Sequence, residues 1–423
     1  MNVPFFRPSI TEAEIAEVVK CLRSGWLTSG PLAARFEREF AVAVGAKHTI
    51  ALNSCTAALH LAVEALGLRA GQAVLVPTMT FAATAEIVRY RGAVPILVDC
   101  DPITGNMDLA DAAKKLNDLK AGRLPTVISR ELVPVGIIPV HVAGLMMDVA
   151  AIHAFARQHG LWIVEDAAHA TPAAWRSGPE RPWQKCGEGT AAVTCYSFYA
   201  NKTITTGEGG MAATNDPVLA DRIRLMALHG LSRDAWTRYA GGPWDYRIVA
   251  PGYKYNMTDV AAAIGVHQLR RVEELQQARA ERAATYCRAF AEVNELELPP
   301  NPVDRLHSWH LFTIALRLEH LPIDRDEFVR RLGAAGVGFS VHWRPLHLHP
   351  YYQEQFGWKP EMLPVASREW VRRVSLPLFP DMTREEQAHV IATVKDLCRP
   401  SSLAPTPLRE VRHESDVLEV AAS

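Results

Sequence analysis

The sequence has few cysteines, and they follow no recognisable pattern. The seven cysteines are scattered, odd in number and never spaced as Cys-x-x-Cys. This spacing excludes a zinc site built on Cys-x-x-Cys pairs and indicates no disulfide framework. The chain also lacks an excess of either charge, because 45 lysines and arginines balance 46 aspartates and glutamates. Such a balance is not typical of proteins that bind nucleic acids or anionic membranes, and we expect neither kind of partner.

Long apolar runs are also missing from the sequence. No run reaches the roughly 20 residues that a membrane-spanning helix needs. The N-terminal residues do not contain the apolar core of a signal peptide, and no segment repeats another. These absences lead us to expect a protein of the reducing cytoplasm that is not inserted in a membrane.

The chain does contain the apolar residues that a large core requires. Hydrophobic residues make up 48% of its 423 residues, enough for two domains. Short apolar runs alternate with helical patterns through the first 260 residues, and the runs that resemble strands are residues 49–52, 73–77, 94–99, 136–142 and 161–164. Because these runs are apolar throughout, they predict an α/β fold with a mostly parallel sheet that helices cover on both faces.

A helix is predicted near the start of the chain. Thr11 and Glu14 form a capping box before it, and Gly25 can end it. Apolar residues recur between them at helical spacing. They predict one apolar face, which consists of Ile15, Val18, Val19 and Leu22.

The pattern changes after about residue 256. A long helical stretch, residues 261–286, is predicted to connect two domains, and later residues mix strand-like and helical patterns. From residue 399 onward, prolines, serines and mixed charge predict a poorly ordered tail. The predicted organisation is a large α/β domain (1–260), a connecting helix (261–295), a small C-terminal α+β domain (296–398) and the tail (399–423).

Polar residues gather where the predicted strands end. An apolar run delivers Ser197 and, five positions later, Lys202, just before a turn rich in threonine and glycine. Ligands of α/β proteins bind at the carboxyl ends of parallel strands, which meet at one edge of the sheet. A partly desolvated lysine there can lose its proton and act as a nucleophile or form a Schiff base. Most lysines near turns are instead solvated surface charges.

Two other strand ends contribute candidate ligands. Ser54, Cys55 and Thr56 open a helix directly after a strand, so its free backbone N–H groups can bind a phosphate, although a plain helix cap gives the same pattern. Asp166 ends an apolar run and can keep a ring nitrogen protonated by accepting its hydrogen bond. It can equally be a helix cap. His169 follows within one helical turn, where a structural histidine is the ordinary alternative.

Phe81 can stack on a planar ligand, although core packing alone would explain it. The histidines His342, His347 and His349 do not have the spacing of metal ligands, and no carboxylate lies between them. We therefore expect no metal, and we expect these histidines in a loop at the rim of a substrate site. A Schiff-base lysine, an acid, a phosphate cup and a stacking aromatic ring are together what pyridoxal 5'-phosphate requires.

Six segments, taken in their order and spacing, carry a specific resemblance. They are residues 24–31, 53–59, 139–141, 165–170, 197–210 and 252–257. On these segments the chain resembles the DegT/DnrJ/StrS family of pyridoxal-phosphate sugar aminotransferases, over roughly residues 4–397. Within the family it is most similar to the enzymes that aminate the 4-keto group of UDP-4-keto-arabinose. The resemblance implies the type I aminotransferase fold, which agrees with the division into a large and a small domain.

The resemblance also implies a role for each candidate residue. Lys202 forms the Schiff base with the cofactor and then shuttles the proton, while Asp166 pairs with the pyridine nitrogen. His169 lies near the ring, and Phe81 stacks on it. The phosphate is held by Thr56 with its neighbours Ser54 and Cys55, and by Ser197.

Members of the family are dimers with shared active sites, which implies a homodimer for this chain. The loop of Lys254 and Asn256 would then reach the cofactor phosphate of the partner. Many relatives carry asparagine in place of Lys254 and arginine in place of Asn256, so both residues stay candidates for this contact. Cys55 stands where glycine or alanine is common, and we interpret it as a tolerated small residue.

The implied reaction is a ping-pong transamination. An amino donor, usually glutamate, gives its amino group to the cofactor, and a keto sugar on a nucleotide carrier then receives it. A sugar dehydratase is disfavoured, because those relatives carry histidine at the position of Lys202. An aminotransferase of a cyclitol or another non-nucleotide ketone stays open, as does a regulatory protein that binds the cofactor without turnover. Residues 229–251 are predicted to shape the acceptor pocket.

Overall fold

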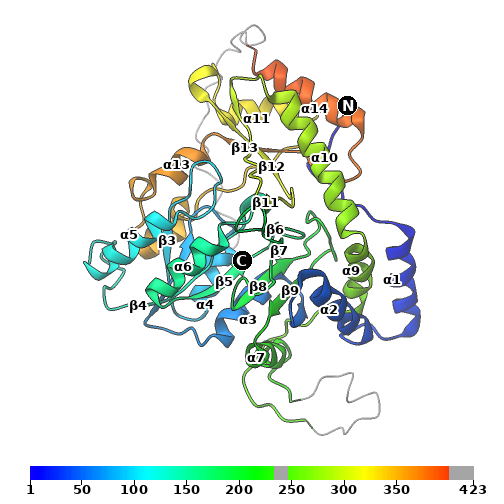
Figure 1. Cartoon of the computed structure of the whole chain (residues 1–423), viewed down its shortest axis with the longest axis vertical. Coiled ribbons are helices and arrows are strands. Elements are labelled where there is room, and N and C mark those ends of the chain that lie inside the picture. Colours follow the sequence, from blue (N-terminus) through cyan, green and yellow to red (C-terminus); the bar gives the residue numbers. More distant parts are fainter. Residues whose placement is uncertain (233–245, 400–423) are drawn as a thin grey trace, which may run out of the picture.

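The computed structural model describes residues 1–232 and 246–399 (Figure 1). Its centre is a seven-stranded sheet in the order β1-β9-β8-β5-β4-β2-β3. The strands are β1 (His48–Leu52), β2 (Gln72–Pro77), β3 (Val94–Val98), β4 (Val133–Ile137), β5 (Trp162–Asp166), β8 (Val193–Ser197) and β9 (Gly210–Thr214). β9 runs antiparallel to the other six strands. The predicted α/β fold with a mostly parallel sheet is confirmed.

Helices cover both faces of this sheet. Alternate residues of β9 show the two faces, because Ala212 belongs to one core while Met211 and Ala213 belong to the other. The first core contains α3 (Cys55–Ala65), α4 (Ala83–Tyr90), α5 (Leu109–Lys120), α6 (Val149–His159) and α7 (Pro217–Ala227). The second contains α2 (Pro31–Val44) and α9 (Asp259–Arg270). Burial on both faces explains why the strands read as continuous apolar runs.

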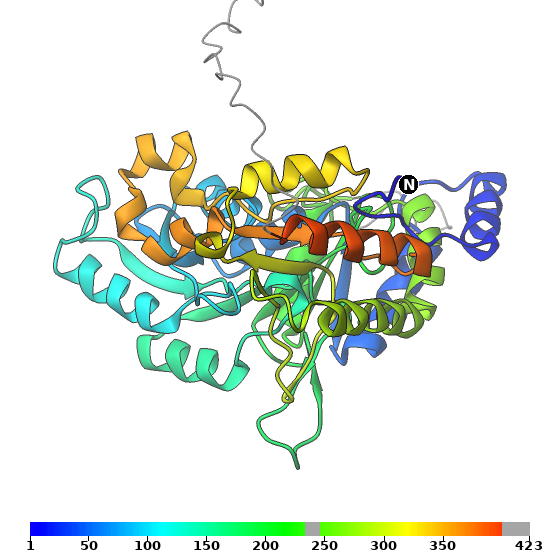
Figure 2. The ribbon, with the colours of Figure 1, turned by 90° about the horizontal axis from the view of Figure 1, so that it is seen from above.

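The small domain has its own sheet and core. Its strands have the order β10-β12-β13, which are β10 (Leu296–Glu297), β12 (Phe312–Leu316) and β13 (Arg373–Leu376). The helices packed there are α10 (Val272–Phe290), α11 (Arg325–Ala334) and α14 (Arg384–Leu397). Helices α11 and α14 lie side by side, with α10 next to α14 (Figures 1 and 2). Val3 also belongs to this core and pairs with Val337, so the N-terminus joins the small domain.

The chain also returns to the large domain after β12. Tyr352, Trp358 and Leu363 pack into the same core as β2 and α3. Tyr352 lies on α12 (Pro350–Phe356), and Trp358 and Leu363 lie on either side of the short turn η4 (Pro360–Met362). The turn η3 (Leu346–Leu348) precedes α12, and α13 (Pro364–Trp370) follows η4. The predicted domain boundaries at residues 260, 295 and 398 stay a prediction. Part of the segment assigned to the small domain nevertheless packs into the core of the large one.

Three short strands form a separate small sheet in the order β11-β6-β7. They are β6 (Ala174–Trp175), β7 (Gln184–Lys185) and β11 (Arg305–Leu306). Because β11 follows β10 and β6 follows β5, this sheet joins the small domain to the large one. Two further single helical turns are η1 (Val142–Gly144) and η2 (Leu318–His320).

The predicted connecting helix is not continuous. Helix α9 ends at Arg270 and α10 begins at Val272, because Arg271 has non-helical dihedral angles (φ −103°, ψ 6°). The side chain of Arg271 forms ion pairs with Glu14 and Glu274 at the break. The predicted single helix over residues 261–286 is therefore wrong. Of the predicted tail only Arg399 is described, and the middle of the predicted acceptor segment, residues 233–245, lies outside the described residues.

The first helix, α1 (Glu12–Ser24), begins and ends where predicted, with both bonds of the capping box and a left-handed Gly25 (φ 76°). Its predicted apolar face does not point into a core. Ile15 is 47% exposed and Leu22 is 52% exposed. Within the described residues, no helix is both long and apolar enough to cross a membrane.

Candidate active site

The carboxyl ends of β1, β5 and β8 lie at one edge of the sheet. Asp166 ends β5, and the neighbouring β8 ends at Ser197. Ser197 pairs with Gly210 of β9, which pairs in turn with Leu52 at the end of β1. Gly210 also lies directly against the start of α3, because a Cβ atom there would come within 2.3 Å of the carbonyl carbon of Ser54. The structure thus brings the predicted phosphate ligands together.

The start of α3 is built to receive an anion. The hydroxyl of Ser54 accepts the N–H of Ala57 at 3.1 Å and caps the helix. The first N–H groups of a helix have no acceptor inside it, so those of Cys55 and Thr56 can bind a phosphate. Burial raises the pKa of the Cys55 thiol well above its usual range. The thiol is therefore neutral and places no negative charge beside a phosphate.

Lys202 lies at the same edge. Its backbone N–H donates to the carbonyl of Tyr199 at 2.9 Å, which turns the chain back after β8. Burial lowers the pKa of Lys202 to about 8, and the nearby Asp166 carboxylate opposes that shift. At pH 7 about a tenth of such lysines are neutral, against about 3 in 10,000 for a lysine in water. Lys202 therefore has its nucleophilic form available near neutral pH.

Asp166 is buried and held by two hydrogen bonds. Its carboxylate accepts the hydroxyl of Thr84 at 2.8 Å and the backbone N–H of Ala168 at 3.1 Å. Burial raises the pKa of Asp166, and the bond from Thr84 and the charge of Lys202 oppose this. A cationic ring N–H would stabilise the charged form in the same way. Thr84, near the start of α4, did not emerge from the sequence pattern.

His169 sits in a buried group of aromatic rings. Its Nδ1 accepts the N–H of Ala143 at 3.2 Å, so its proton lies on Nε2, which is a hydrogen-bond donor. The ring stacks on Trp343 at 5.2 Å and lies 4.1 Å from the ring of His310, centroid to centroid. Burial, with the charge of Lys202, holds the pKa of His169 well below its usual range. His169 is therefore a neutral donor at this edge.

The histidines predicted at a substrate rim have different surroundings. The ring of His342 lies 5.5 Å from that of Trp343, which stacks on His169, so His342 is beside the candidate site. Burial, with the charge of Lys202, lowers the pKa of His342 to about 4. His347 is fully buried, and its two ring nitrogens lie 2.8 Å from the hydroxyls of Thr78 and Ser367. Its two hydrogen bonds tie the returning segment to the end of β2. The predicted rim position is therefore wrong for His347.

Phe81 is 64% exposed, which excludes the core packing that would otherwise explain it. An exposed aromatic ring near the start of α4 is free to stack on a planar ligand.

We expect Phe81→Ala to weaken binding of pyridoxal phosphate by about 2- to 10-fold, the size of one ring contact. Fluorescence titration of the cofactor-free protein measures this. Phe81→Tyr is the matched control and should bind normally, whereas equal affinity of the alanine variant would contradict stacking.

Lys254 and Asn256 lie in a loop next to the end of β1. The Oδ1 atom of Asn256 accepts the ammonium of Lys254 at 2.6 Å, and its Nδ2 donates to Ser29 at 2.7 Å. Asn256 thus uses both ends of its amide within the chain. Lys254 is exposed and keeps further N–H groups for another partner.

One group among the described residues has ligand atoms close enough for a metal ion: His141, Glu165 and Cys186, all buried. The carboxylate of this group already has protein partners. Glu165 accepts hydrogen bonds from Thr190 and Thr194, at 2.6 and 2.8 Å. Nδ1 of His141 accepts the N–H of Met147 at 3.3 Å, which leaves the proton on Nε2 facing Glu165. We interpret the group as structural support for the end of β5.

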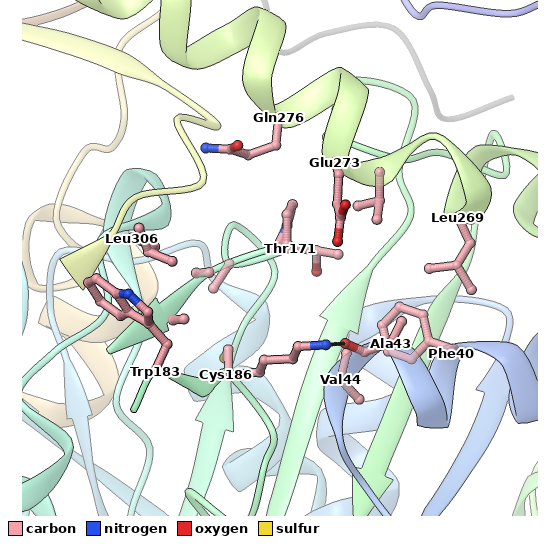
Figure 3. Close-up of a pocket in the computed structure, with 16 residues that line it drawn as sticks. Phe40, Ala43, Val44, Thr171, Trp183, Cys186, Leu269, Glu273, Gln276 and Leu306 are labelled. Carbon is pink, nitrogen blue, oxygen red and sulfur yellow. Dashed lines mark hydrogen bonds between the residues drawn. The ribbon is translucent and has the colours of Figure 1, made fainter. Parts of the chain in front are cut away.

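A separate pocket of about 330 Å³ lies between α2, the segment 170–174 and the start of α10 (Figure 3). Its walls are largely apolar and include Phe40, Trp183, Leu269 and Leu306. None of the residues predicted to bind the cofactor lines it. This pocket is therefore not the site at the sheet edge.

Comparisons with known proteins agree with this geometry. The model of the DegT/DnrJ/EryC1/StrS aminotransferase family matches residues 8–395. The spore coat polysaccharide biosynthesis protein SpsC of Bacillus subtilis (strain 168) is 41% identical over 94% of this chain and 97% of its own length. Spr1654 of Streptococcus pneumoniae, solved in its PMP form, has a TM-score of 0.83 and 31% identity, covering 94% of this chain and 99% of that one. The sugar aminotransferase CalS13 of Micromonospora echinospora has a TM-score of 0.78 and 30% identity, covering 93% and 99%.

The fold and these relatives define a pyridoxal-phosphate-dependent aminotransferase with the type I fold. The residues at the edge fit that cofactor. A helix start crowded by a glycine can cradle a phosphate, and the buried Asp166 and the half-buried Lys202 lie at the ends of neighbouring strands. The chain belongs to the DegT/DnrJ/EryC1/StrS aminotransferase family. The family assigned from the sequence, the enzyme class and the cofactor are confirmed.

Proposed function

We propose that this aminotransferase takes an amino group from glutamate and transfers it to the 4-keto group of a nucleotide-linked sugar. The observation that carries the proposal is that the half-buried Lys202 follows β8 at the edge of the sheet where Asp166 ends the neighbouring β5. Relatives named as sugar aminotransferases or as polysaccharide biosynthesis proteins support a sugar as acceptor. The nucleotide carrier, the 4-keto position and the glutamate donor follow from the resemblance of the motifs.

Each residue at the edge has a defined task in this proposal. Pyridoxal phosphate, when bound, supplies a conjugated ring that takes up the electron pair left when a proton leaves the substrate carbon. Lys202 attaches the cofactor and, once released, moves that proton as base and then acid. Asp166 accepts the hydrogen bond of the ring N–H and keeps it protonated. His169 lies beside the ring as a neutral donor, and the phosphate is bound by the start of α3 and by Ser197.

A panel of ketones tests the proposal. Nucleotide 4-keto sugars, nucleotide 3-keto sugars and a keto cyclitol are each incubated with glutamate, and 2-oxoglutarate release and product mass are followed. We expect conversion of a nucleotide 4-keto sugar. Conversion of the cyclitol alone would favour a non-nucleotide acceptor. If glutamate does not shift the absorbance of the yellow protein at all, a regulatory role without turnover would replace the proposal.

We also propose that two chains form a homodimer with shared active sites. Three exposed apolar side chains on and after α1 support such a contact, and they are Ile15, Leu22 and Leu27. Of the two loop residues, we assign the phosphate contact in the partner to Lys254, because Asn256 already uses its amide oxygen and an amide N–H within its own chain. Asn256 then holds Lys254 in position.

Subunit mixing tests the shared site. Lys202→Ala and Lys254→Ala are co-expressed with different tags, and the mixed dimer is purified on both. If Lys254 acts across the interface, one of the two sites in the mixed dimer is intact, so we expect about half of the wild-type activity. Each variant alone should have little. A mixed dimer as inactive as its parents would show that Lys254 acts within its own subunit.

A further inference from the structure

His310 comes from the small domain but reaches the site of the large one. It lies just before β12, in a segment that hydrogen-bonds to η1. The backbone N–H of Ser308 donates to Gly144 at 3.1 Å, and that of Leu311 donates to Ala143 at 3.3 Å. These bonds hold the segment against the carboxyl edge of the large sheet. The side chain of His310 is only 4% exposed.

The contacts of His310 centre on Lys202. Its Nε2 lies 3.5 Å from the Nζ atom of Lys202. Within residues 1–232 and 246–399, it is the one side chain within hydrogen-bond distance of that amine. The carbonyl of His310 accepts the guanidinium of Arg279 at 3.3 Å, which fixes its backbone. A distance of 3.5 Å is long, but catalytic hydrogen bonds are often long before ligands bind.

Packing alone does not explain a histidine at position 310, because the second ring nitrogen, Nδ1, gains no hydrogen bond within the part of the chain that the structure describes. Nδ1 of His310 is buried and has no hydrogen-bond partner among the described residues. A buried polar atom without a partner costs free energy, and an apolar residue of similar volume would avoid that cost. The ring therefore has to gain something elsewhere, and among the described residues the one side chain within hydrogen-bond distance of its Nε2 is Lys202.

We propose that His310 is a positioning residue for Lys202. Nε2 of His310 accepts an N–H of the Lys202 amine and so directs the Nζ atom toward the cofactor and substrate. The inference rests on the role proposed for Lys202. Burial, with the charges of His169 and Lys202, keeps the pKa of His310 well below its usual range. The ring is therefore neutral and has a lone pair for the amine. Through this bond the packing of the small domain controls where the reactive nitrogen points.

The attachment of the cofactor to Lys202 provides a test that does not depend on turnover. Cofactor-free protein is mixed with pyridoxal phosphate, and absorbance gives the rate of attachment between pH 6 and 10. Borohydride then fixes the product, and mass spectrometry identifies the labelled lysine. Two amides are compared, because the amide of His310→Gln can occupy the place of Nε2, whereas that of His310→Asn occupies the place of Nδ1.

We expect attachment in His310→Asn to be about tenfold slower at pH 8 than in the wild type, with a shifted midpoint in its pH dependence. His310→Gln should stay within about threefold, since it keeps the hydrogen bond. His307→Gln changes a buried histidine of the same segment that does not contact Lys202, and it should attach the cofactor normally. Circular dichroism and thermal melting check that each variant is folded.

The outcomes separate the inference from the proposal on which it rests. Label on another lysine in the wild type would overturn the role of Lys202, and the inference with it. Label on Lys202 with equal rates and equal pH dependence for the asparagine variant and the wild type would overturn only the role of His310. If attachment of the cofactor were slowed equally in His310→Asn, His310→Gln and His307→Gln, the effect would come from altered packing of the segment and not from loss of this hydrogen bond.

Discussion

Lys202→Ala should abolish amino transfer, with a fall in kcat of at least about 10³-fold. The substitution removes both the amine that attaches the cofactor and the group that moves the proton, and a positioned proton-transfer group alone contributes about 10² to 10⁴. The measurement is 2-oxoglutarate release from glutamate together with the absorbance of the purified protein. The variant should also lose the covalent label that borohydride fixes in the wild type.

A control separates this loss from a general effect of removing a lysine. Lys114 lies on α5, its side chain is 66% exposed, and it pairs with Asp118 at 3.0 Å. An exposed pair of this kind contributes little to stability. Lys114→Ala should therefore keep the activity and the label of the wild type. If Lys202→Ala still exchanged amino groups with glutamate at a comparable rate, Lys202 would not be the reactive amine.

The main part of the site could be predicted from local sequence. Ser54, Asp166 and Ser197 each follow a short apolar run, and Lys202 comes five residues after the last of them. In a parallel sheet such strand ends meet at one edge, so their convergence needs no knowledge of the loops. The burial of Asp166 follows from the same rule, because helices cover both faces of the sheet, whereas Lys202 lies beyond the end of β8 and is half-buried.

The residues that complete the site could not be predicted in this way. His310 and Trp343 are separated from Lys202 by more than 100 residues. His310 arrives through the packing of its segment against η1, and Trp343 through its stacking on His169. No local pattern specifies that packing. Thr84 bonds to Asp166 from the start of α4, where a threonine has no distinctive sequence signal. The rim position predicted for His347 is wrong because no sequence signal distinguishes a histidine bonded to two hydroxyls from a histidine in an exposed loop.

The sequence also does not reveal whether an apolar residue packs in a core or meets a partner. A helix with one apolar face predicts burial of that face, but Ile15 and Leu22 are exposed in the single chain. The pattern is explained if the face meets a second chain, because an apolar stripe is equally suited to a core and to an interface. Phe81 is a similar case. Its local sequence fits core packing, and only its exposure favours a ligand.

Asp166→Asn is the second change with a large expected effect. The amide has nearly the shape of the carboxylate, but it carries no charge to keep a ring nitrogen protonated. Removing one such electrostatic group costs about 10²- to 10³-fold in kcat. We expect a loss of at least about 10²-fold, measured with glutamate and the best acceptor, while the label on Lys202 is still formed. Activity within a few fold of the wild type would contradict the assigned role.

The hydrogen bond from Thr84 allows a second test of the charge on Asp166, in which the direction of the pKa change is known. The bond stabilises the charged form of Asp166 and so opposes the rise in its pKa that burial causes. Thr84→Val removes the hydroxyl with little change in shape, so the pKa of Asp166 should rise further. The carboxylate is then protonated at a higher pH, and the acid limb of the kcat profile should move upward in pH. Thr84→Ser keeps the hydroxyl and should leave the limb in place, because the charge on Asp166, and not the packing around it, sets that limb.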